Sequence, residues 1–563
     1  MLARWKDYDR QRAGHDLGAA VIVVVMLVPQ SLAYAQVAGM PLQTGLYASI
    51  LPLIAYALFG TSSALSVGPV AVISLMTAAT LSGLEATDTA TYTMLAAWLA
   101  MLSGAMLFLA GFLRMGYVAN LMSHPVVSGF MTGAAILIVL GQLKPLLGMR
   151  GEGETALELA RALIAAAHTV QPPTAAVGLA ALAALWWLPR AIRWTGRQLG
   201  MRTGVIDIAR KLAPLLVVIV AILATGMFDL DDRYRVAVVG VIPAGIPGFG
   251  IAIPTLAQVK SLLLPAFVIG LIGFVESVSV AQSLALQRRE RIDPNAELRG
   301  LGAANCAAAI SGGFPVTGGL SRSIVNFSAG ARTPLAGVFA ALMMLGVVTW
   351  LTELFTRLPS AVLAAAIIVP VMGLIDTHVL KEAWGYSRGD AWAYLGTAGG
   401  VLVFGIELGI LLGVALSLTT IVWQASMPHI AEIGRVPGTS HYRNVKRAAV
   451  ETFPHLLALR IDADLFFANV RPVEQAIQAA ISSRPGLEHL LLDLSAVNQI
   501  DLTGLEGLRE LNRSLQGRGV RLHLAEVKGP VLDRLARSTF LQELAAPPFR
   551  FTHDAFVALN ADG

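Results

Sequence analysis

Arg322 has long apolar runs on both sides and follows a stretch rich in glycine and proline. That stretch, Ser311–Gly319, reads Ser-Gly-Gly-Phe-Pro-Val-Thr-Gly-Gly, and its glycines and Pro315 interrupt regular structure. A helix that starts after such a break has unpaired backbone N–H groups and a partial positive charge at its N-terminus. Because a guanidinium beside it adds a full charge, the pattern predicts a site for a small oxyanion.

A similar break lies in the N-terminal half, where Ser66–Ala71 reads Ser-Val-Gly-Pro-Val-Ala. Pro69 suits the first turn of a helix, because its missing N–H would have been unpaired there anyway. Paired Gly/Pro-interrupted segments in two halves of a chain are typical of inverted-repeat transporters whose site lies at the membrane midplane. Ser66–Ala71 is therefore expected to form the other half of the Arg322 site.

Glu276 is a carboxylate within the apolar run Gly273–Val280. An ionised carboxylate is costly in such a span, so this residue is expected to take up a proton and to couple transport to a proton gradient. Two alternatives stay open. The alternative for Arg322 is that it serves only as a structural ion-pair partner or extends to the membrane surface. The alternative for Glu276 is that it only pairs with Arg322 or caps a helix.

The elements that carry these residues are predicted to be membrane-spanning helices. Hydrophobic residues make up 55% of the chain and charged residues 14%, against roughly 25% charged in soluble domains. Fourteen apolar runs are expected to span, seven in each half, so the two repeats are inverted. The expected spans are 17–37, 44–60, 66–84, 91–112, 121–143, 173–189 and 212–228, then 258–286, 297–312, 318–330, 334–351, 359–375, 391–407 and 409–426.

The loop charges predict the orientation. Basic residues gather on one predicted face, which also holds both termini, whereas acidic residues are frequent on the other face. By the positive-inside rule, the termini are expected in the cytoplasm and the protein in the cell inner membrane. This topology explains the net charge of +5, so nucleic acid is not expected as a partner. The basic loop residues are Arg4, Lys6, Arg10, Arg12, Arg190, Arg193, Arg197, Arg202, Arg210, Lys211, Arg288, Arg289, Arg291 and Arg299.

Other chemistry has little support in the sequence. One cysteine, Cys306, excludes a disulfide framework and a Cys-based metal cluster. Neither metal-ligand spacing nor a P-loop nor a nucleophile–base arrangement is recognisable, so neither an enzyme nor a cofactor is expected. The energy for transport is expected from an ion gradient.

The C-terminal part has a different pattern. Predicted strands at 456–461, 490–494 and 522–525 alternate with helices that start near Arg471, Thr503 and Pro530. This alternation is typical of a small α/β domain with βαβ units. The expected boundaries are 1–428 for the transmembrane domain, 429–449 for a linker and 450–563 for a cytoplasmic domain.

Several motifs together resemble the sulfate permease (SulP) family of anion transporters, with a STAS domain at the C-terminal end. The resemblance covers nearly the whole chain in the right order. The membrane motifs are Val28–Ala35, Gly45–Tyr47, Gly60–Ser62, Ser66–Pro69 and Pro315–Gly318. The STAS-like motifs are Leu492–Ser495, Ile500–Gly504 and Gly519–Val520.

This resemblance implies where the anion binds. In the family it lies between the facing N-termini of the third and tenth spans, and the first span supplies a further wall. Some relatives have Phe at the position of Tyr34 and an aromatic residue at that of Val70, so a smaller, more polar site is expected here. Carried over by position, the expected substrate-binding residues are Gln30, Tyr34, Val70, Ala71, Ser321 and Arg322.

The resemblance also bears on coupling and mechanism. Sodium-coupled bicarbonate relatives pair an Asp with a nearby Thr, whereas this chain has Glu276 and, four residues on, Val280. We therefore predict symport of sulfate with H⁺ by elevator-like motion of a core domain, with spans 3, 8 and 10, against a gate domain. The alternatives are a bicarbonate, chloride or dicarboxylate transporter or exchanger, a nucleobase–proton symporter, and a membrane-anchored anion sensor that signals through the STAS domain.

The expected partners are a small anion, H⁺, the lipid bilayer, a second copy of the chain in a homodimer and a regulatory protein that binds the STAS domain. In STAS-like anti-sigma antagonists, a turn that corresponds to Asp501–Gly504 is phosphorylated, which makes Thr503 a candidate acceptor. The alternative is that Asp501 and Thr503 only shape and cap the start of a helix.

Overall fold

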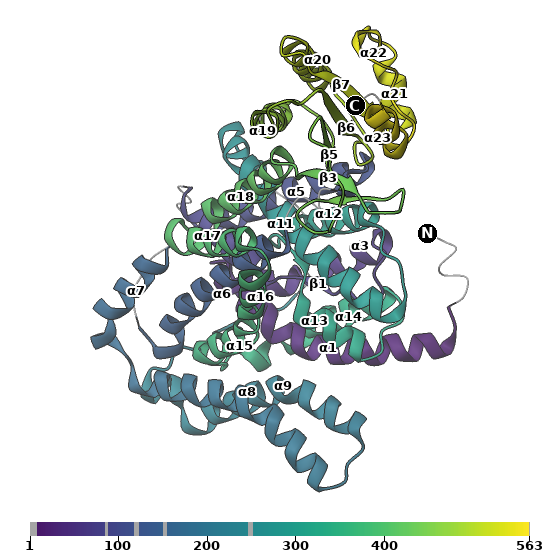
Figure 1. The fold of residues 1–563 in the computed structure, drawn as a ribbon. Helices are drawn as coiled ribbons and strands as arrows, with labels where there is room; N and C mark the ends of the chain where they lie inside the picture. Colours follow the sequence, from purple (N-terminus) through teal and green to yellow (C-terminus); the bar gives the residue numbers. More distant parts are fainter. Residues whose placement is uncertain (1–7, 85–87, 118–122, 150–154, 246–251, 562–563) are drawn as a thin grey trace. The chain divides into compact units, whose positions relative to one another are not determined.

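A computed structural model describes residues 8–84, 88–117, 123–149, 155–245 and 252–561. The chain divides into two compact units, Met1–Ser417 and Leu418–Gly563. The first is helical apart from one short strand pair, and the second is built around a sheet (Figure 1).

Nine stretches of the described residues are long and apolar enough to cross a membrane. The shared feature is an apolar composition on all sides, which is expected for helices that face lipid and other helices at once. They comprise α1 (Arg10–Val37), α2 (Leu42–Tyr47) with α3 (Leu51–Phe59), α5 (Thr89–Phe112), α6 (His124–Leu147), α8 (Pro172–Gln198), α9 (Thr203–Phe228), α11 (Leu256–Arg288), α14 (Leu335–Gly346) with the two short turns η4 (Val347–Leu351) and η5 (Thr352–Phe355), and α15 (Ser360–Met372) with α16 (Thr377–Tyr386).

Five more helices occupy the other expected spans in the described part of the chain. These are α4 (Ala71–Ser82), α12 (Pro294–Ile310), α13 (Leu320–Ser328), α17 (Arg388–Phe404) and α18 (Ile406–Ser426). Each apolar run that was expected to span thus contains at least one helix. The short helices α7 (Ala156–Ala165), α10 (Leu230–Tyr234) and α16 lie outside the expected spans.

The helices of the first unit pack in two groups. In the first group, α1–α5 pack with α11–α14, and in the second, α6, α8 and α9 pack with α15–α17. α8 and α9 lie side by side (Figure 1), and side chains such as Trp187 and Val220 are exposed along them, as expected for a surface in contact with lipid. The first group contains α4, α11 and α13, and is the predicted core domain; the second is the predicted gate domain.

Small residues allow the core helices to approach closely. A Cβ atom on Gly302 of α12 would lie 2.5 Å from the backbone nitrogen of Phe108 in α5. No side chain fits into that space, so the two backbones pack directly on each other, a common arrangement of helices in membranes.

The two sequence breaks pair with each other. β1 (Val67–Gly68) and β2 (Thr317–Gly318) form an antiparallel pair in which Val67 is opposite Gly318 and Gly68 is opposite Thr317. α4 starts just after β1, and α13 starts just after β2. Extended backbone in the middle of a membrane protein needs partners for its polar groups, and here each break supplies them for the other.

The second unit has a five-stranded sheet in the order β4-β3-β5-β6-β7. Its strands are β3 (Ile430–Arg435), β4 (Tyr442–Asn444), β5 (Leu456–Ile461), β6 (His489–Asp493) and β7 (Arg521–Ala525). The last three are parallel, whereas β3 is antiparallel to both of its neighbours. The helices are α19 (Val470–Ser482), α20 (Leu502–Gln516), α21 (Gly529–Leu535), α22 (Phe540–Glu543) and α23 (Thr552–Ala561).

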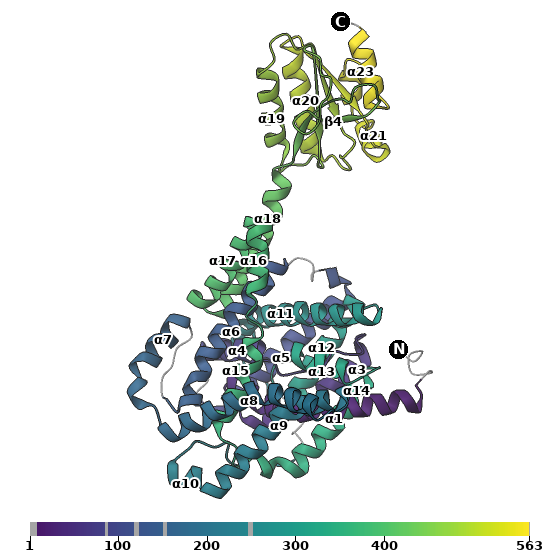
Figure 2. The same cartoon turned by 60° about the horizontal axis from the view of Figure 1, so that its bottom comes forward.

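Helices cover both faces of this sheet (Figure 2). Alternate residues of the central strands point to opposite faces, so that Leu457 packs with α19 and α20 while Leu456 packs with α23. The structure differs from the linker expected over 429–449, because that segment contains β3 and β4. Ala431 and Ile433 of β3 are buried, but Glu432 between them and Arg435 after them obscure the strand in the sequence.

Candidate functional site

One small cavity in the first unit, of about 50 Å³, brings the predicted site residues together. This volume is enough for a few water-sized groups or one small ion. All six residues expected to bind substrate line it, and so does Glu276. The lining consists of Gln30, Tyr34, Val70, Ala71, Val72, Glu276, Gly319, Leu320, Ser321, Arg322, Pro370, Val371 and Leu374.

Two helix N-termini end at this cavity. α4 starts after Val70 and α13 starts after Gly319, and both of these residues have extended backbones. Neither helix has a side-chain cap, so the N–H groups of the first turns have no partner within their own helices. Each N-terminus also carries a partial positive charge, which favours an anion between them.

Arg322 lies in the first turn of α13 and is only 2% exposed. Its Nη1 donates a 2.7 Å hydrogen bond to the carbonyl oxygen of Pro69, next to the start of α4. Its Nε and Nη2 have no hydrogen-bond partner among the described residues. Buried donors that stay unpaired are costly, and a bound anion would satisfy them. The guanidinium points inward, so it does not extend to the membrane surface.

Gly319 allows the guanidinium to lie close to the backbone. A Cβ atom at this position would be 3.1 Å from Nη2 and 3.2 Å from Nε of Arg322. It would also be 3.2 Å from Cγ1 of Val70. A side chain here would therefore displace the arginine or narrow the entrance between the two helix ends.

Glu276 reaches the same cavity from the middle of α11. Its Oε2 is buried and has no hydrogen-bond partner among the described residues. Since Nε and Nη2 of Arg322 are unpaired as well, the two side chains share a cavity without a hydrogen bond between these atoms. A carboxylate and a guanidinium that are held apart in this way leave room for a third charged group.

Gln30 and Tyr34 supply the wall on α1. They are four residues apart, which places them on one face of the helix. Both are largely buried, with 8% and 7% exposure. Both residues line the cavity.

A network of hydroxyl groups ties α11 to the paired breaks. Thr317 Oγ1 lies 2.6 Å from the carbonyl oxygen of Gly273 and 2.7 Å from Ser277 Oγ. The Gly318 N–H donates to Ser277 Oγ at 2.8 Å. Ser277 follows Glu276 directly, so the network fixes the part of α11 that carries the carboxylate.

Amide side chains hold the breaks in place from other helices, and the sequence reasoning missed them. Asn305 of α12 binds Val316 through both its amide nitrogen and its oxygen, at 2.9 Å each. Asn326 of α13 donates to the carbonyl oxygen of Ala64 at 3.0 Å. The available signal was a lone amide side chain within each apolar run.

The sequence reasoning also missed the wall at the end of α15, which consists of Pro370, Val371 and, just beyond the helix, Leu374. These apolar residues come from the second helix group, so the cavity lies where the two groups meet. An apolar wall in an apolar span has no distinctive pattern, and only the packing identifies it.

Two buried carboxylates outside the cavity were missed as well. Glu297 of α12 is fully buried and accepts hydrogen bonds from Tyr56 Oη at 2.6 Å and from the Thr61 N–H at 2.7 Å. Asp16 of α1 accepts from the N–H groups of Arg332 and Thr333 at 2.6 and 3.1 Å. Both carboxylates fix loops to helices.

In the part of the chain that the structure describes, no group of three or more His, Cys, Asp and Glu side chains is placed to hold a metal ion. The predicted phosphate acceptor Thr503 is exposed in the first turn of α20. Asp501 caps this helix by accepting a 2.7 Å hydrogen bond from the Gly504 N–H.

Family models match both units. The model of the sulfate permease family matches residues 14–397, and the STAS domain model matches residues 447–555. The chain is 34% identical to a probable sulfate transporter 4.2 of Arabidopsis thaliana, over 98% of this chain and 81% of the relative. It is 32% identical to a probable sulfate transporter of Mycobacterium tuberculosis, over 96% of this chain and 94% of the relative.

Solved structures share the fold. A structure of SLC26A9 superposes with a TM-score of 0.88 at 22% identity, over 100% of this chain and 92% of that chain. The transmembrane domain of the cyanobacterial bicarbonate transporter BicA gives a TM-score of 0.59 at 24% identity, over 73% of this chain and 98% of that chain.

Proposed function

This chain belongs to the sulfate permease family of membrane transporters, and we propose that it carries sulfate into the cell in symport with H⁺. The observation that supports this most directly is that Nε and Nη2 of Arg322 have no hydrogen-bond partner among the described residues, inside a cavity bounded by two uncapped helix N-termini. Relatives along nearly the whole chain are named sulfate transporters, which favours sulfate over other anions.

Sulfate suits the cavity chemically. It carries two negative charges and four acceptor oxygens, so that one oxygen can face the open edge of Arg322 while others face the first turns of α4 and α13. The hydrogen bonds and charges would replace the water that the anion loses. The neutral walls formed by Val70 and Val371 exclude competing water.

Glu276 is proposed to couple protons to sulfate. An ionised carboxylate in the same small cavity repels a dianion, and this repulsion is strong because the surroundings are poorly polarisable. A proton on Glu276 removes the repulsion, so proton and sulfate each favour the binding of the other. This reciprocity is the thermodynamic requirement for symport.

We propose that transport proceeds by an elevator-like motion of the core group, which contains α4, α11 and α13, against the gate group. The core group contributes the polar half of the cavity, whereas α15 contributes an apolar wall. When the core group slides along the apolar α15 wall with the anion bound, no specific bond between the core group and that wall has to break. We place the transport domain at 1–428, in the cell inner membrane with cytoplasmic termini.

The C-terminal STAS domain, whose sheet includes β3 and β4, is proposed to regulate the transporter or to support a homodimer. A phosphate on Thr503 would add negative charge at the N-terminus of α20, where the helix dipole favours it. Replacement of Thr503 by Ala tests this role. Loss of phosphate incorporation in cells, with unchanged sulfate uptake by the purified variant, is the expected result.

The decisive experiment is uptake of labelled sulfate by the purified full-length chain in proteoliposomes, with imposed pH gradients and with or without sodium. Saturable uptake that an inward proton gradient drives and that sodium leaves unchanged is expected. Stronger competition by bicarbonate, chloride or a dicarboxylate than by unlabelled sulfate would reassign the substrate. Uracil inhibition in place of sulfate inhibition would indicate a nucleobase symporter. Absent anion flux, with anions still altering protease access to the STAS domain, would indicate a sensor.

A further inference from the structure

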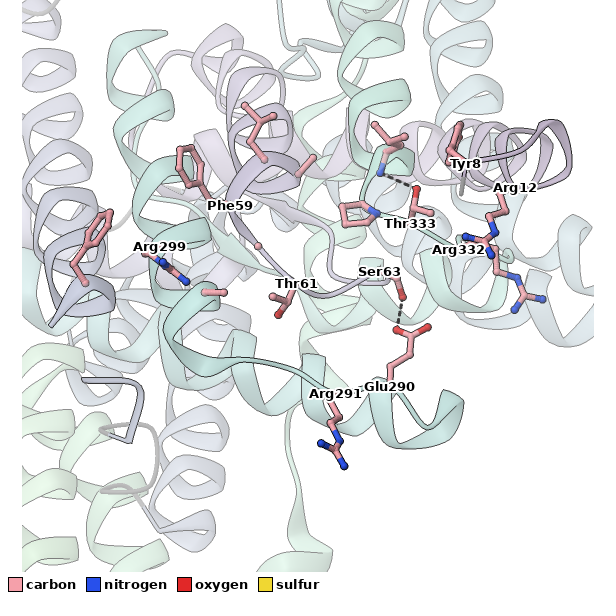
Figure 3. Close-up of a pocket in the computed structure, with 17 residues that line it drawn as sticks. Tyr8, Arg12, Phe59, Thr61, Ser63, Glu290, Arg291, Arg299, Arg332 and Thr333 are labelled. Atoms are coloured by element: carbon pink, nitrogen blue, oxygen red, sulfur yellow. Dashed lines mark hydrogen bonds between the residues drawn. The ribbon is translucent and has the colours of Figure 1, made fainter. Parts of the chain in front are cut away.

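A second pocket, of about 650 Å³, lies at one end of the membrane helices (Figure 3). Its lining comes from the start of α1, the ends of α3 and α5, the turn after α11, the start of α12 and the loop before α14. The described residues that line it and those that line the anion cavity do not overlap. It is therefore a separate feature of the first unit.

The charged lining of this pocket is mostly basic. Arg12, Arg291, Arg299 and Arg332 line it, against a single carboxylate, Glu290. Figure 3 shows Thr61 and Ser63 between Arg299 on one side and Arg12 and Arg332 on the other. The Glu290 carboxylate accepts a 2.8 Å hydrogen bond from Ser63 Oγ. Arg299 lies 4.0 Å from the Asp293 carboxylate, so three of the four arginines have no ion-pair partner among the described residues.

The rest of the lining is apolar. Leu58 and Phe112 are 44% and 60% exposed, and Phe59 and Leu335 extend the same wall. Each of these residues is at the end of a helix that spans the membrane or just beyond it. The pocket thus combines a cationic part with an apolar part at the ends of the membrane helices.

We propose that this pocket binds the phosphate headgroup of an anionic membrane lipid. Guanidinium groups recognise phosphate oxygens through paired N–H donors, and the pocket offers several of them. The apolar wall fits the upper part of an acyl chain, which a free phosphate ester lacks. A bound headgroup would connect α1, through Arg12, with the loop before α14, through Arg332.

The test uses the purified full-length chain in detergent, titrated with phosphatidylglycerol or with zwitterionic phosphatidylcholine, and binding is read from native mass spectrometry and from thermal stabilisation. Arg291→Gln combined with Arg332→Gln is compared with Arg193→Gln combined with Arg197→Gln. The control removes two exposed arginines from α8, outside the pocket. We expect each arginine to contribute about fivefold, so that the pocket variant loses affinity for phosphatidylglycerol about 25-fold while the control keeps it.

Several results would overturn the proposal. Unchanged affinity in the pocket variant would show that the pocket is not the lipid site. An equal loss in the control would mean that lipid binding follows the surface charge alone. Displacement of phosphatidylglycerol by soluble glycerol phosphate at a similar concentration would assign the pocket to a free phosphate ester. Equal binding of the two lipids by the wild type would exclude a phosphate-selective site. Unchanged sulfate affinity in the pocket variant is expected, because its arginines are outside the anion cavity.

Discussion

Two charged sites lie buried among the core helices, and they differ in how their hydrogen-bonding groups are used. At Glu297, the carboxylate receives hydrogen bonds from Tyr56, Thr61 and Ser62. In the cavity, and counting only partners in the described part of the chain, Arg322 has one hydrogen bond and two unpaired nitrogens, and Glu276 has an unpaired oxygen. A buried charge whose partners are all within the protein stabilises the fold, whereas one with unpaired groups can bind a ligand.

The largest expected effect is on transport, from Arg322→Ala. The variant loses the open donors of the cavity, and charge-assisted hydrogen bonds of this kind contribute about 1.5–3 kcal/mol each, so sulfate affinity is expected to fall about 100-fold or more. Thermal stability should change little, because only one protein hydrogen bond is lost. Sulfate binding and thermal unfolding of the purified variant check both statements. Normal sulfate affinity in this variant would show that Arg322 does not belong to the sulfate-binding site.

Glu276→Gln is expected to abolish uptake driven by a proton gradient. The amide has nearly the same shape but neither takes up nor releases a proton, so the variant resembles a permanently protonated site. Sulfate should still bind, and exchange of internal for external sulfate should continue at a rate that does not depend on pH. Proton-driven accumulation at the wild-type level would place coupling elsewhere.

Glu297→Ala tests the expectation that the hydrogen-bonded Glu297 carboxylate stabilises the fold. Its removal leaves Tyr56 Oη and the Thr61 N–H buried without their acceptor, at a cost of about 1–3 kcal/mol for each group. We expect a clear loss of thermal stability, with unchanged sulfate affinity in the protein that remains folded. A variant as stable as the wild type, with weakened sulfate binding, would reverse the assigned roles.

Gly319→Ala is expected to move the Arg322 guanidinium without removing it. The new Cβ would be 3.1 Å from Nη2 of Arg322, so the guanidinium must shift by a few tenths of an ångström. Misplacement of a binding group by 1 Å can lower function about 100-fold, and we expect a loss of about tenfold in sulfate affinity. Gly141→Ala in α6 is the control, because a Cβ there meets nothing within 4 Å. Equal losses in both variants would point to a general effect on the helices.

Ser277→Ala is expected to have the smallest effect. It removes the acceptor of the Gly318 N–H and the contact with Thr317, which amounts to about 1 kcal/mol of stability. Sulfate affinity should fall only slightly, because Glu276 and Arg322 remain. A loss as large as that of Arg322→Ala would mean that the hydroxyl group contacts the anion directly.

The site was predictable where an unusual residue interrupts an apolar background. Arg322, Glu276 and the two Gly/Pro breaks are conspicuous because charge and helix-breaking residues are costly in a membrane. The α15 wall with Val371 was not predictable, because an apolar residue in a span is equally compatible with contact to lipid, to another helix or to a ligand. β3 was read as part of a linker for a related reason, since Glu432 and Arg435 interrupt its short run of buried residues, and only the pairing with β4 and β5 reveals the strand.

The amino-acid sequence by itself determined the class of protein, the positions of the two breaks and the residue types at the site, because hydrophobic length and the cost of buried charge act locally. The tertiary structure alone decided that residues 67–68 pair with residues 317–318, that α15 closes the cavity, and that Glu297 is satisfied while Arg322 is not. These outcomes depend on which distant groups meet, and a hydrogen bond between residues about 250 positions apart leaves no local pattern in the chain.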